Sequence, residues 1–174
     1  TKIMQDLYSP FVRTGNPVIT MDVKSAEMTK YASNSFLAVK ISYANEIANI
    51  CEAVGANAEM VRIGMCADKR IGSQFLFPGL GFGGSCFPKD IKALTKTAIN
   101  YNCNHYLLSA TDEVNRLQRE LFIQKIINKL GEDLSNKTLA VWGLAFKPKT
   151  NDMREAPAIT IINALLERGA KIQA

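Results

Sequence analysis

The sequence predicts a mainly α-helical chain that ends in the opening of a parallel α/β domain, and two observations support this. Apolar residues recur at spacings of three and four from Ser25 to Val54, and again from about Tyr106 to Leu130. Later the pattern changes to a short, almost continuously apolar run, Thr138 to Trp142, which is typical of a strand buried on both faces. Helices therefore dominate, and a different architecture begins near the C-terminal end.

The first of these helices is the longest and ends at Gly55, a common helix stop. About thirty residues at roughly 1.5 Å each give a length of about 45 Å. That is longer than a small domain needs, so we expect the helix to pack against a partner chain. The residues that carry its period are Ala32, Phe36, Val39, Tyr43, Ile47, Ile50 and Val54.

Shorter elements follow in order. A second helix is expected over Glu59 to Ala67, and then a glycine-rich loop runs from Asp68 to Ser85. A helix resumes near Pro88, which suits a first-turn position because its missing N–H costs nothing there. The helix that begins near Tyr106 is closed by Gly131.

The C-terminal segment is expected to form a β-α-β unit. After the strand at 138–142 comes a polar loop, then a helix from about Pro157 to Arg168 with Gly169 as its stop, and a second strand begins at Lys171. A domain boundary is expected near residues 132 to 137. We also expect the chain to be truncated at both ends.

Composition narrows the function classes. With 174 residues and 47% hydrophobic content, the chain can bury a real core. Its net charge of +5 is scattered, which favours anionic small molecules over nucleic acid. No run approaches the roughly 18 apolar residues of a membrane helix, and no signal segment opens the chain, so a soluble protein is expected.

Cysteine and histidine usage excludes several kinds of site. The four cysteines show no CxxC or CxxH spacing, so we expect neither a metal site nor a disulfide framework, but reduced thiols in a cytoplasmic protein. The single histidine, His105, follows a polar stretch and is expected in a surface loop. A metal site with several histidines is therefore excluded, and a Ser-His-Asp triad would have only His105 as its base.

One glycine motif imitates a dinucleotide-binding turn. Gly79, Gly81 and Gly84 fit the pattern G-x-G-x-x-G, but that fingerprint needs a strand directly before it and a helix opening from it. Here Pro78 precedes it and the helix waits until about Pro88, so we reject the dinucleotide interpretation. The glycines by themselves fit equally a flexible connector and a loop whose backbone approaches a ligand closely.

Cys86 decides between these alternatives, because it stands at the end of the loop and just before a helix start. Amide N–H groups and the helix dipole at such a position favour a thiolate, and nearby Lys89 adds positive charge. Cys86 is therefore a candidate nucleophile. Cys51 and Cys66 lie in apolar helical contexts, where a cysteine is usually a small core residue.

Three further residues are candidates on weaker grounds. Asp90 lies four residues after Cys86 and could face the same pocket, although an acid in the first turn of a helix is also ordinary capping chemistry. Lys30 and Asn34 are four apart on the long helix, so both could point a donor at one oxygen. By itself, a Lys and an Asn at this spacing more often form a solvent-exposed polar face of a helix than a binding site.

Three segments together resemble a known family. The run Gly81 to Asp90, reading GFGGSCFPKD, resembles the active-site segment of the UDP-glucose 6-dehydrogenase type in the UDP-glucose/GDP-mannose dehydrogenase family. Lys30 to Leu37 resembles the family's central helix, and Phe146 to Glu155 resembles the start of its C-terminal nucleotide-binding domain. The order and spacing of all three agree over essentially the whole chain.

The resemblance implies a domain plan. Residues 1–21 would be the end of a truncated N-terminal NAD-binding domain, 22–134 a helical central domain that carries the catalytic cysteine and forms a dimer, and 135–174 the start of a Rossmann-like UDP-binding domain. The implied partners are a nucleotide-sugar substrate, UDP-glucose, and a second copy of the chain joined through the long central helix. The implied cofactor is NAD.

It also implies a reaction and roles. The sugar C6 alcohol becomes a carboxylate in two hydride transfers that consume two NAD, through a thiohemiacetal and a thioester on Cys86. Lys30 and Asn34 would stabilise oxyanion character and fix the substrate, while Asp90 would assist proton movement or orient water. The other residues implied to contact substrate are Arg70, Phe75, Gly79, Gly81, Gly83, Phe146 and Lys147, with Lys89 and Arg154 near NAD.

One residue departs from the family pattern, and several features are missing. Relatives commonly carry a polar residue where this chain has Phe77, which argues against a side-chain contact to the diphosphate there. The NAD-binding fingerprint domain, the upstream active-site glutamate and the rest of the UDP domain lie outside these residues. We therefore expect the isolated chain to be inactive, and NADH production by it would refute that.

Three alternatives stay open at this point. A GDP-mannose or other nucleotide-sugar dehydrogenase would use a catalytic cysteine in the same way. A non-catalytic helical dimerisation module would make Cys86 incidental, and iodoacetamide would then modify it no faster than the other cysteines. A cysteine hydrolase or acyltransferase would need His105 as its base.

Overall fold

The computed structural model describes residues 2–12 and 18–174 and is built mainly from helices, which confirms the predicted class. Residues 1 and 13–17 of the expected N-terminal stub lie outside the described part. The elements are α1 (Lys2–Tyr8), the 3-10 turn η1 (Ser9–Phe11), α2 (Val23–Val54), α3 (Ala58–Cys66), α4 (Phe87–Asn100), α5 (Tyr106–Leu130), β1 (Thr138–Ala140), α6 (Pro157–Leu166) and β2 (Lys171–Gln173).

Local sequence signals set the helix ends. The Asp22 carboxylate accepts a hydrogen bond of 3.0 Å from the backbone N–H of Ser25, which caps the start of α2. Gly55 ends the same helix with φ of 73°, a left-handed conformation that glycine adopts without steric cost. The Asn57 side chain caps α3 in the same way as Asp22 caps α2. Pro88 and Pro157 occupy first-turn positions of α4 and α6.

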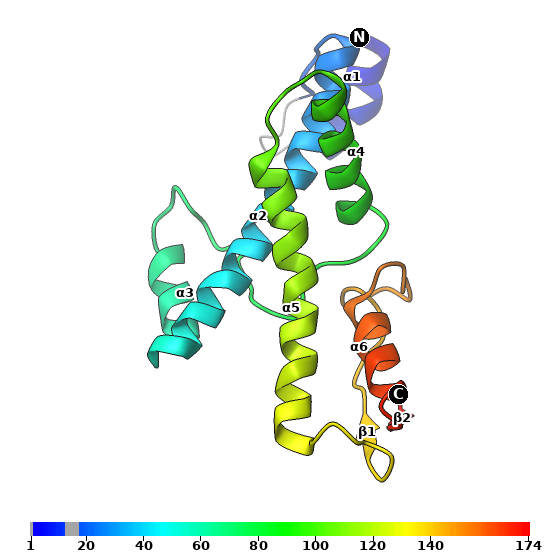
Figure 1. Ribbon diagram of the computed structural model, residues 1–174. Helices are drawn as coiled ribbons and strands as arrows, with labels where there is room; N and C mark the ends of the chain where they lie inside the picture. The colour runs from blue at the N-terminus through cyan, green and yellow to red at the C-terminus, as the bar shows by residue number, and fades with distance from the viewer. Residues whose placement is uncertain (1, 13–17) are drawn as a thin grey trace.

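Helix α5 connects two halves of the molecule. Figure 1 shows it running beside α2 and α4 over its first part, and beside α6 over its last part. The long connection between α3 and α4 returns to the crossing of α2 and α5, so the glycine-rich loop lies against both helices. This arrangement brings the residues before Cys86 into contact with segments far away in the sequence.

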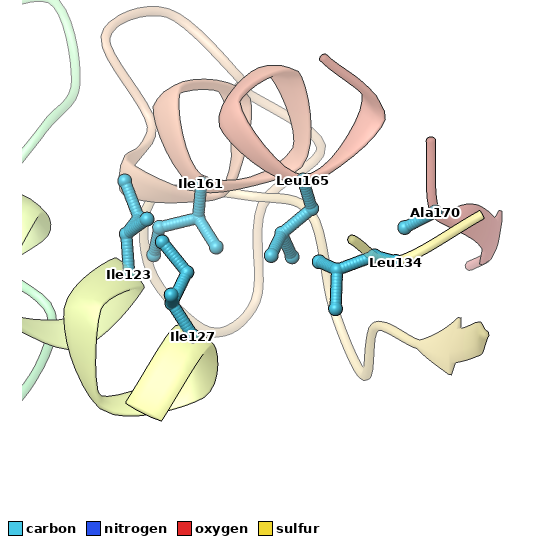
Figure 2. Packing of buried hydrophobic residues seen from close by; sticks show 6 residues of the cluster. All are labelled: Ile123, Ile127, Leu134, Ile161, Leu165 and Ala170. Carbon is cyan, nitrogen blue, oxygen red and sulfur yellow. The ribbon is translucent and has the colours of Figure 1, made fainter. Parts of the chain in front are cut away.

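The C-terminal half is organised by an apolar cluster. Ile123 and Ile127 of α5 face Ile161 of α6, and the fully buried Leu134 lies beside Leu165, toward Ala170 (Figure 2). Strands β1 and β2 pair in parallel, with Leu139 opposite Ile172. The β-α-β order expected from the sequence is therefore confirmed.

The expectation of a strand buried on both faces is wrong. Leu139 is half-buried, its strand neighbours Thr138 and Ala140 are exposed, and the strand ends before Trp142, whose side chain is fully exposed. The physical reason is that, among residues 2–12 and 18–174, β2 is the one strand that pairs with β1. A two-stranded sheet with one helix against it cannot cover both faces.

Helix α2 turns its small residues inward and its large apolar residues outward. Ala38, Ser42 and Asn45 are buried against the rest of the chain. The side chains that give the helix its apolar period are largely exposed, and we call these the α2 stripe: Phe36, Tyr43, Ile50 and Val54. In the described part of the chain, no helix is both long enough and apolar enough to cross a membrane.

Candidate active site

Cys86 lies at the N-cap of α4 and its side chain is exposed. The Ser85 hydroxyl lies 3.8 Å from its sulfur. The position follows from the sequence, because Pro88 favours a helix start immediately after the cysteine. The sulfur is thus accessible at a helix N-terminus, as the sequence predicted, and is not enclosed in the apolar interior.

Asp90, one turn further along α4, is fully buried and collects three donors. The Nζ atoms of Lys30 and Lys89 both pair with its carboxylate, and the Nδ2 atom of Asn34 donates to it at 2.7 Å. Lys30 and Asn34 bond to the same oxygen, Oδ2. The prediction that this pair could aim at one oxygen is therefore confirmed, and that oxygen belongs to Asp90.

The charge on Asp90 is stabilised by these contacts. Burial by itself would raise the pKa of the Asp90 carboxyl, but hydrogen bonds from Lys30, Lys89 and Asn34 lower it to about 2. The hydrogen bond to Asp90 in turn raises the pKa of Lys89. Asp90 is therefore an anion at neutral pH. Helix capping does not account for the buried carboxylate, because Lys30 and Asn34 of α2 bond to its Oδ2 atom and Lys89 bonds to its Oδ1 atom.

Lys89 differs from its expected role beside the sulfur, because its ammonium group is bound to the Asp90 carboxylate. Arg154 lies closer to that role. Hydrogen bonding to Asp152 raises the pKa of Arg154, and the electrostatic influence of Cys86 adds in the same direction. An open cleft of about 660 Å³ borders this region. Its lining residues are Gly84, Ser85, Pro88, Lys89, Lys92, Arg154 and Glu155.

The glycine loop meets the C-terminal segment so closely that side chains would not fit. A Cβ on Gly83 would lie 2.2 Å from the backbone oxygen of Glu155, and one on Gly84 would lie 2.7 Å from the Phe146 ring. The N–H of Gly84 donates to the carbonyl of Arg154 at 2.7 Å. Glycine is therefore required here by the close approach of another segment of the same chain. The sequence analysis had weighed only a flexible connector and a backbone that approaches a ligand, and this contact is a third case.

Three other predicted residues lie around this loop. The ring of Phe75 packs on Phe87 with centroids 6.0 Å apart. Lys147 is exposed and its Nζ atom lies 5.3 Å from the centre of the Phe146 ring. Phe146 thus joins the site through its contact with Gly84.

Among residues 2–12 and 18–174, no hydrogen bond or ion pair of the Arg70 side chain joins it to Cys86 or to Asp90. The Arg70 guanidinium binds Asp68 and is almost fully exposed. Phe77, the departure from the family pattern, has Arg62 over its ring at 4.7 Å. His105 is partly buried at the N-cap of α5, where its Nδ1 atom lies 2.8 Å from the Ser109 hydroxyl.

The sequence analysis missed the side chains that hold the loop. Asn115 of α5 bonds to both backbone polar groups of Phe82, and Arg119 donates to the same carbonyl at 2.8 Å. The Asn45 side chain accepts the N–H of Gly79 at 2.7 Å, and Gln118 donates to its carbonyl at 2.8 Å. The available signal was an asparagine inside a helix, where its propensity is poor and a specific partner is expected.

Comparison with known proteins identifies the family. The profile described as "UDP-glucose/GDP-mannose dehydrogenase family, central domain" matches residues 24–117, more than half of the chain. The chain belongs to this family. The profile of the family's UDP binding domain matches residues 140–174. Both matches agree with the resemblance inferred from the sequence.

Among its relatives, UDP-glucose 6-dehydrogenase YwqF of Bacillus subtilis is 51% identical over 171 residues, which cover 98% of this chain and 38% of that protein. A UDP-glucose 6-dehydrogenase of Pseudomonas aeruginosa is 43% identical, with the same coverage. The structure of a UDP-glucose dehydrogenase from Pyrobaculum islandicum superposes with a TM-score of 0.90 at 37% identity, covering 98% of this chain and 39% of that one. The chain therefore spans about two fifths of the length of these relatives.

Proposed function

We propose that this chain supplies the catalytic cysteine of an NAD-dependent nucleotide-sugar dehydrogenase that oxidises UDP-glucose to UDP-glucuronate. The observation that carries the proposal is the exposed sulfur of Cys86, one helical turn from a buried carboxylate that gathers Lys30, Asn34 and Lys89. Membership of the family supports it. We further propose the domain division at residues 21/22 and 134/135 given by the resemblance.

In the proposed reaction, Cys86 forms two covalent adducts with the substrate in turn. The thiolate sulfur adds to the C6 aldehyde carbon, the C=O π pair moves to oxygen, and protonation gives a thiohemiacetal. Loss of a hydride and a proton from that adduct leaves a thioester. Water then adds to the thioester carbon, the C–S bond breaks, and the products are a carboxylate and the regenerated thiol.

Lys30 and Asn34 are suited to stabilise the oxygen that becomes negative. An ammonium group has three N–H donors and an amide nitrogen has two, so each keeps a donor after bonding to Asp90. Donors fixed in advance where charge develops stabilise the transition state without reorganisation. In this scheme Asp90, already an anion, orients the two donors and does not give up a proton itself.

The residues along the cleft fit the implied cofactor. NAD, when bound, accepts the hydride that the sugar carbon loses in each oxidation. Lys89, Lys92 and Arg154 line the cleft beside Cys86, and their positive charges suit an anionic diphosphate. Gly84 and Ser85 line the same cleft. We propose that Lys89 and Arg154 hold the cofactor there.

We assign the sugar nucleotide to the loop and to the C-terminal segment. Phe75, Gly79, Gly81 and Gly83 would follow its sugar and diphosphate, while Phe146 and Lys147 would contact the uridine end. The match of residues 140–174 to a UDP binding domain supports this assignment.

A homodimer through α2 is part of the proposal, and the α2 stripe supports it. Phe36 is 64% exposed and Val54 is 71% exposed on a helix of 32 residues. Large apolar side chains in a continuous row mark an interaction surface. In such a dimer Arg70, exposed on the monomer, would reach the partner's substrate. Sedimentation of the variant Phe36→Glu should show monomer where the unchanged protein shows dimer.

The decisive experiment uses the full-length protein with UDP-glucose and NAD. Release of two NADH for each sugar supports the proposal, and release of one or none contradicts it. GDP-mannose is the comparison substrate, and we expect its kcat/KM to be lower by roughly ten-fold or more. Faster turnover of GDP-mannose would assign the chain to that branch of the family.

A chemical test separates catalysis from a purely structural role. Iodoacetamide at neutral pH should modify Cys86 faster than Cys103, which is also exposed and lies beyond the other end of α4. Equal rates would favour the alternative of a dimerisation module without chemistry.

A further inference from the structure

The loop that leads to Cys86 is held by side-chain amides at two of its peptide groups. Besides the two contacts that fix Gly79, Asn115 accepts the N–H of Phe82 at 2.7 Å and donates to the carbonyl of Phe82 at 3.1 Å. A single side chain thus bonds to both backbone polar groups of Phe82, while Arg119 also donates to the carbonyl. The arrangement imitates the pairing of a β-strand with a neighbour.

The fit between Asn115 and the loop is specific. A Cβ on Gly81 would lie 2.5 Å from the Asn115 Oδ1 atom, and Gly81 has φ of 102°, which strains any L side chain. Glycine at 81 therefore lets the amide reach the next peptide. Asn115 itself is buried, with 4% of its surface exposed. A buried amide without partners would be costly, so the side chain and the loop determine each other's position.

Phe82 connects the segment held by Asn115 to the residue that follows Cys86. Its ring is buried against Ala38 and Ile91, and it meets the Phe87 ring edge to face with centroids 5.9 Å apart. Phe87 directly follows Cys86 and is the first residue of α4. The backbone on one side of the cysteine and the ring on its other side are therefore fixed through the same residue.

We propose that Asn115 is a positioning residue that fixes the backbone leading to Cys86 at the start of α4 by bonding to both backbone polar groups of Phe82. Asn115 has no contact with Cys86 itself among the bonds of the described residues. The importance of this placement for catalysis rests on the proposed function. The placement itself is a property of the loop and can be measured without any substrate.

The variants for the test are Asn115→Ala, which removes both hydrogen bonds, and Asn115→Asp, which keeps the acceptor for the Phe82 N–H but loses the donor to its carbonyl. The matched control is Asn128→Ala, because Asn128 is an exposed asparagine on the same helix. Asn115→Asp has nearly the shape of asparagine, so it carries the test if Asn115→Ala does not fold.

The first measurement is the mobility of a nitroxide label on Cys86 in the full-length protein, with the exposed Cys103 and half-buried Cys66 replaced by serine. We expect the rotational correlation time to fall by about two-fold or more in Asn115→Ala and less in Asn115→Asp. Asn128→Ala should match the unchanged protein. Equal mobility in Asn115→Ala and Asn128→Ala would overturn the proposal, whatever the enzymatic activity.

The second measurement is steady-state kinetics with UDP-glucose and NAD. Displacement of a nucleophile by about 1 Å can cost up to roughly a hundred-fold in rate. We expect kcat to fall roughly ten- to a hundred-fold in Asn115→Ala, with an intermediate value in Asn115→Asp and KM changed by less than about three-fold. A loss confined to KM would overturn the proposal. If the unchanged protein does not oxidise UDP-glucose, the proposed function fails while the label experiment still decides the role of Asn115.

Discussion

The two ends of helix α5 are held in different ways. Its first half faces the glycine loop with polar side chains, Asn115, Gln118 and Arg119, which bond to backbone groups. Its second half faces α6 with Ile123 and Ile127 in an apolar cluster. Hydrogen bonds depend steeply on distance and angle, whereas apolar burial depends mainly on area. If Cys86 reacts as proposed, the half of α5 nearest to it is therefore the half built from directional contacts.

The largest effect should come from removing the reactive atom. Cys86→Ala deletes an exposed sulfur, so stability should change little while the turnover of UDP-glucose falls by roughly 1,000-fold or more. NADH release and thermal unfolding measure the two effects. Cys103→Ala, at the other exposed cysteine, should retain full activity. Substantial activity in Cys86→Ala would mean that the hydrogen bonds between α5 and the glycine loop do not serve to position a nucleophile.

The apolar half should show the opposite pattern. Leu134 is fully buried in the cluster of Figure 2, so Leu134→Ala should lower the free energy of unfolding by about 2–5 kcal/mol. The activity of each folded molecule should be nearly unchanged, because the residue lies away from Cys86. Leu166→Ala, at a half-exposed position on α6, should cost much less. Denaturant unfolding of both variants checks this, and equal losses would mean that the cluster is loosely packed.

The contact between the glycine loop and the C-terminal segment can be tested at Gly83. Gly83→Ala places a methyl group 2.2 Å from the Glu155 carbonyl oxygen, so the backbone must shift, at a cost of about 1–3 kcal/mol. Gly64→Ala is the matched control. No described atom outside its own helix backbone lies within 4 Å of that position in α3, and alanine should stabilise the helix by up to about 1 kcal/mol. Thermal unfolding should move in opposite directions, and parallel shifts would contradict the close approach.

The smallest effect should be the acid dependence of stability at Asp90. The pKa of Asp90 is about 2 in the folded chain and 3.8 in its ordinary state, so ionised Asp90 contributes stability that is fully present above about pH 4. That contribution is lost as the pH falls from about 4 toward 2. Asp90→Asn should therefore flatten the dependence of the unfolding free energy on pH in this window. Denaturant titrations between pH 2 and 5 measure it, and identical slopes would show that the lysines do not stabilise the charge.

The sequence predicted the helices well because their signals are local. The limits of α5 agree with the expectation, Tyr106 to Leu130, since Gly131 provides the stop. Helix α2 begins two residues earlier than expected because Asp22 caps it, and α6 ends at Leu166, two residues before the expected Arg168. Element ends depend on one or two hydrogen bonds, so such differences are small.

The candidate site was only partly predictable. Cys86, Lys30, Asn34 and Asp90 were named from the sequence, and three of them do meet, with Oδ2 of Asp90 accepting from both Lys30 and Asn34. Asn115 was not named, because it lies 33 residues from its partner Phe82. A contact at that separation leaves no periodic trace along the chain.

By itself the sequence determined the order of the helices, the start of α4 directly after Cys86, and the family, since each is written in neighbouring residues or a continuous motif. Only the tertiary structure decided that Asp90 is buried between two lysines, that Gly83 touches Glu155, and that the apolar stripe of α2 faces outward. The reason is physical. Helix propensity and capping act over a few bonds, whereas burial and ionic pairing depend on segments brought together from opposite ends of the chain.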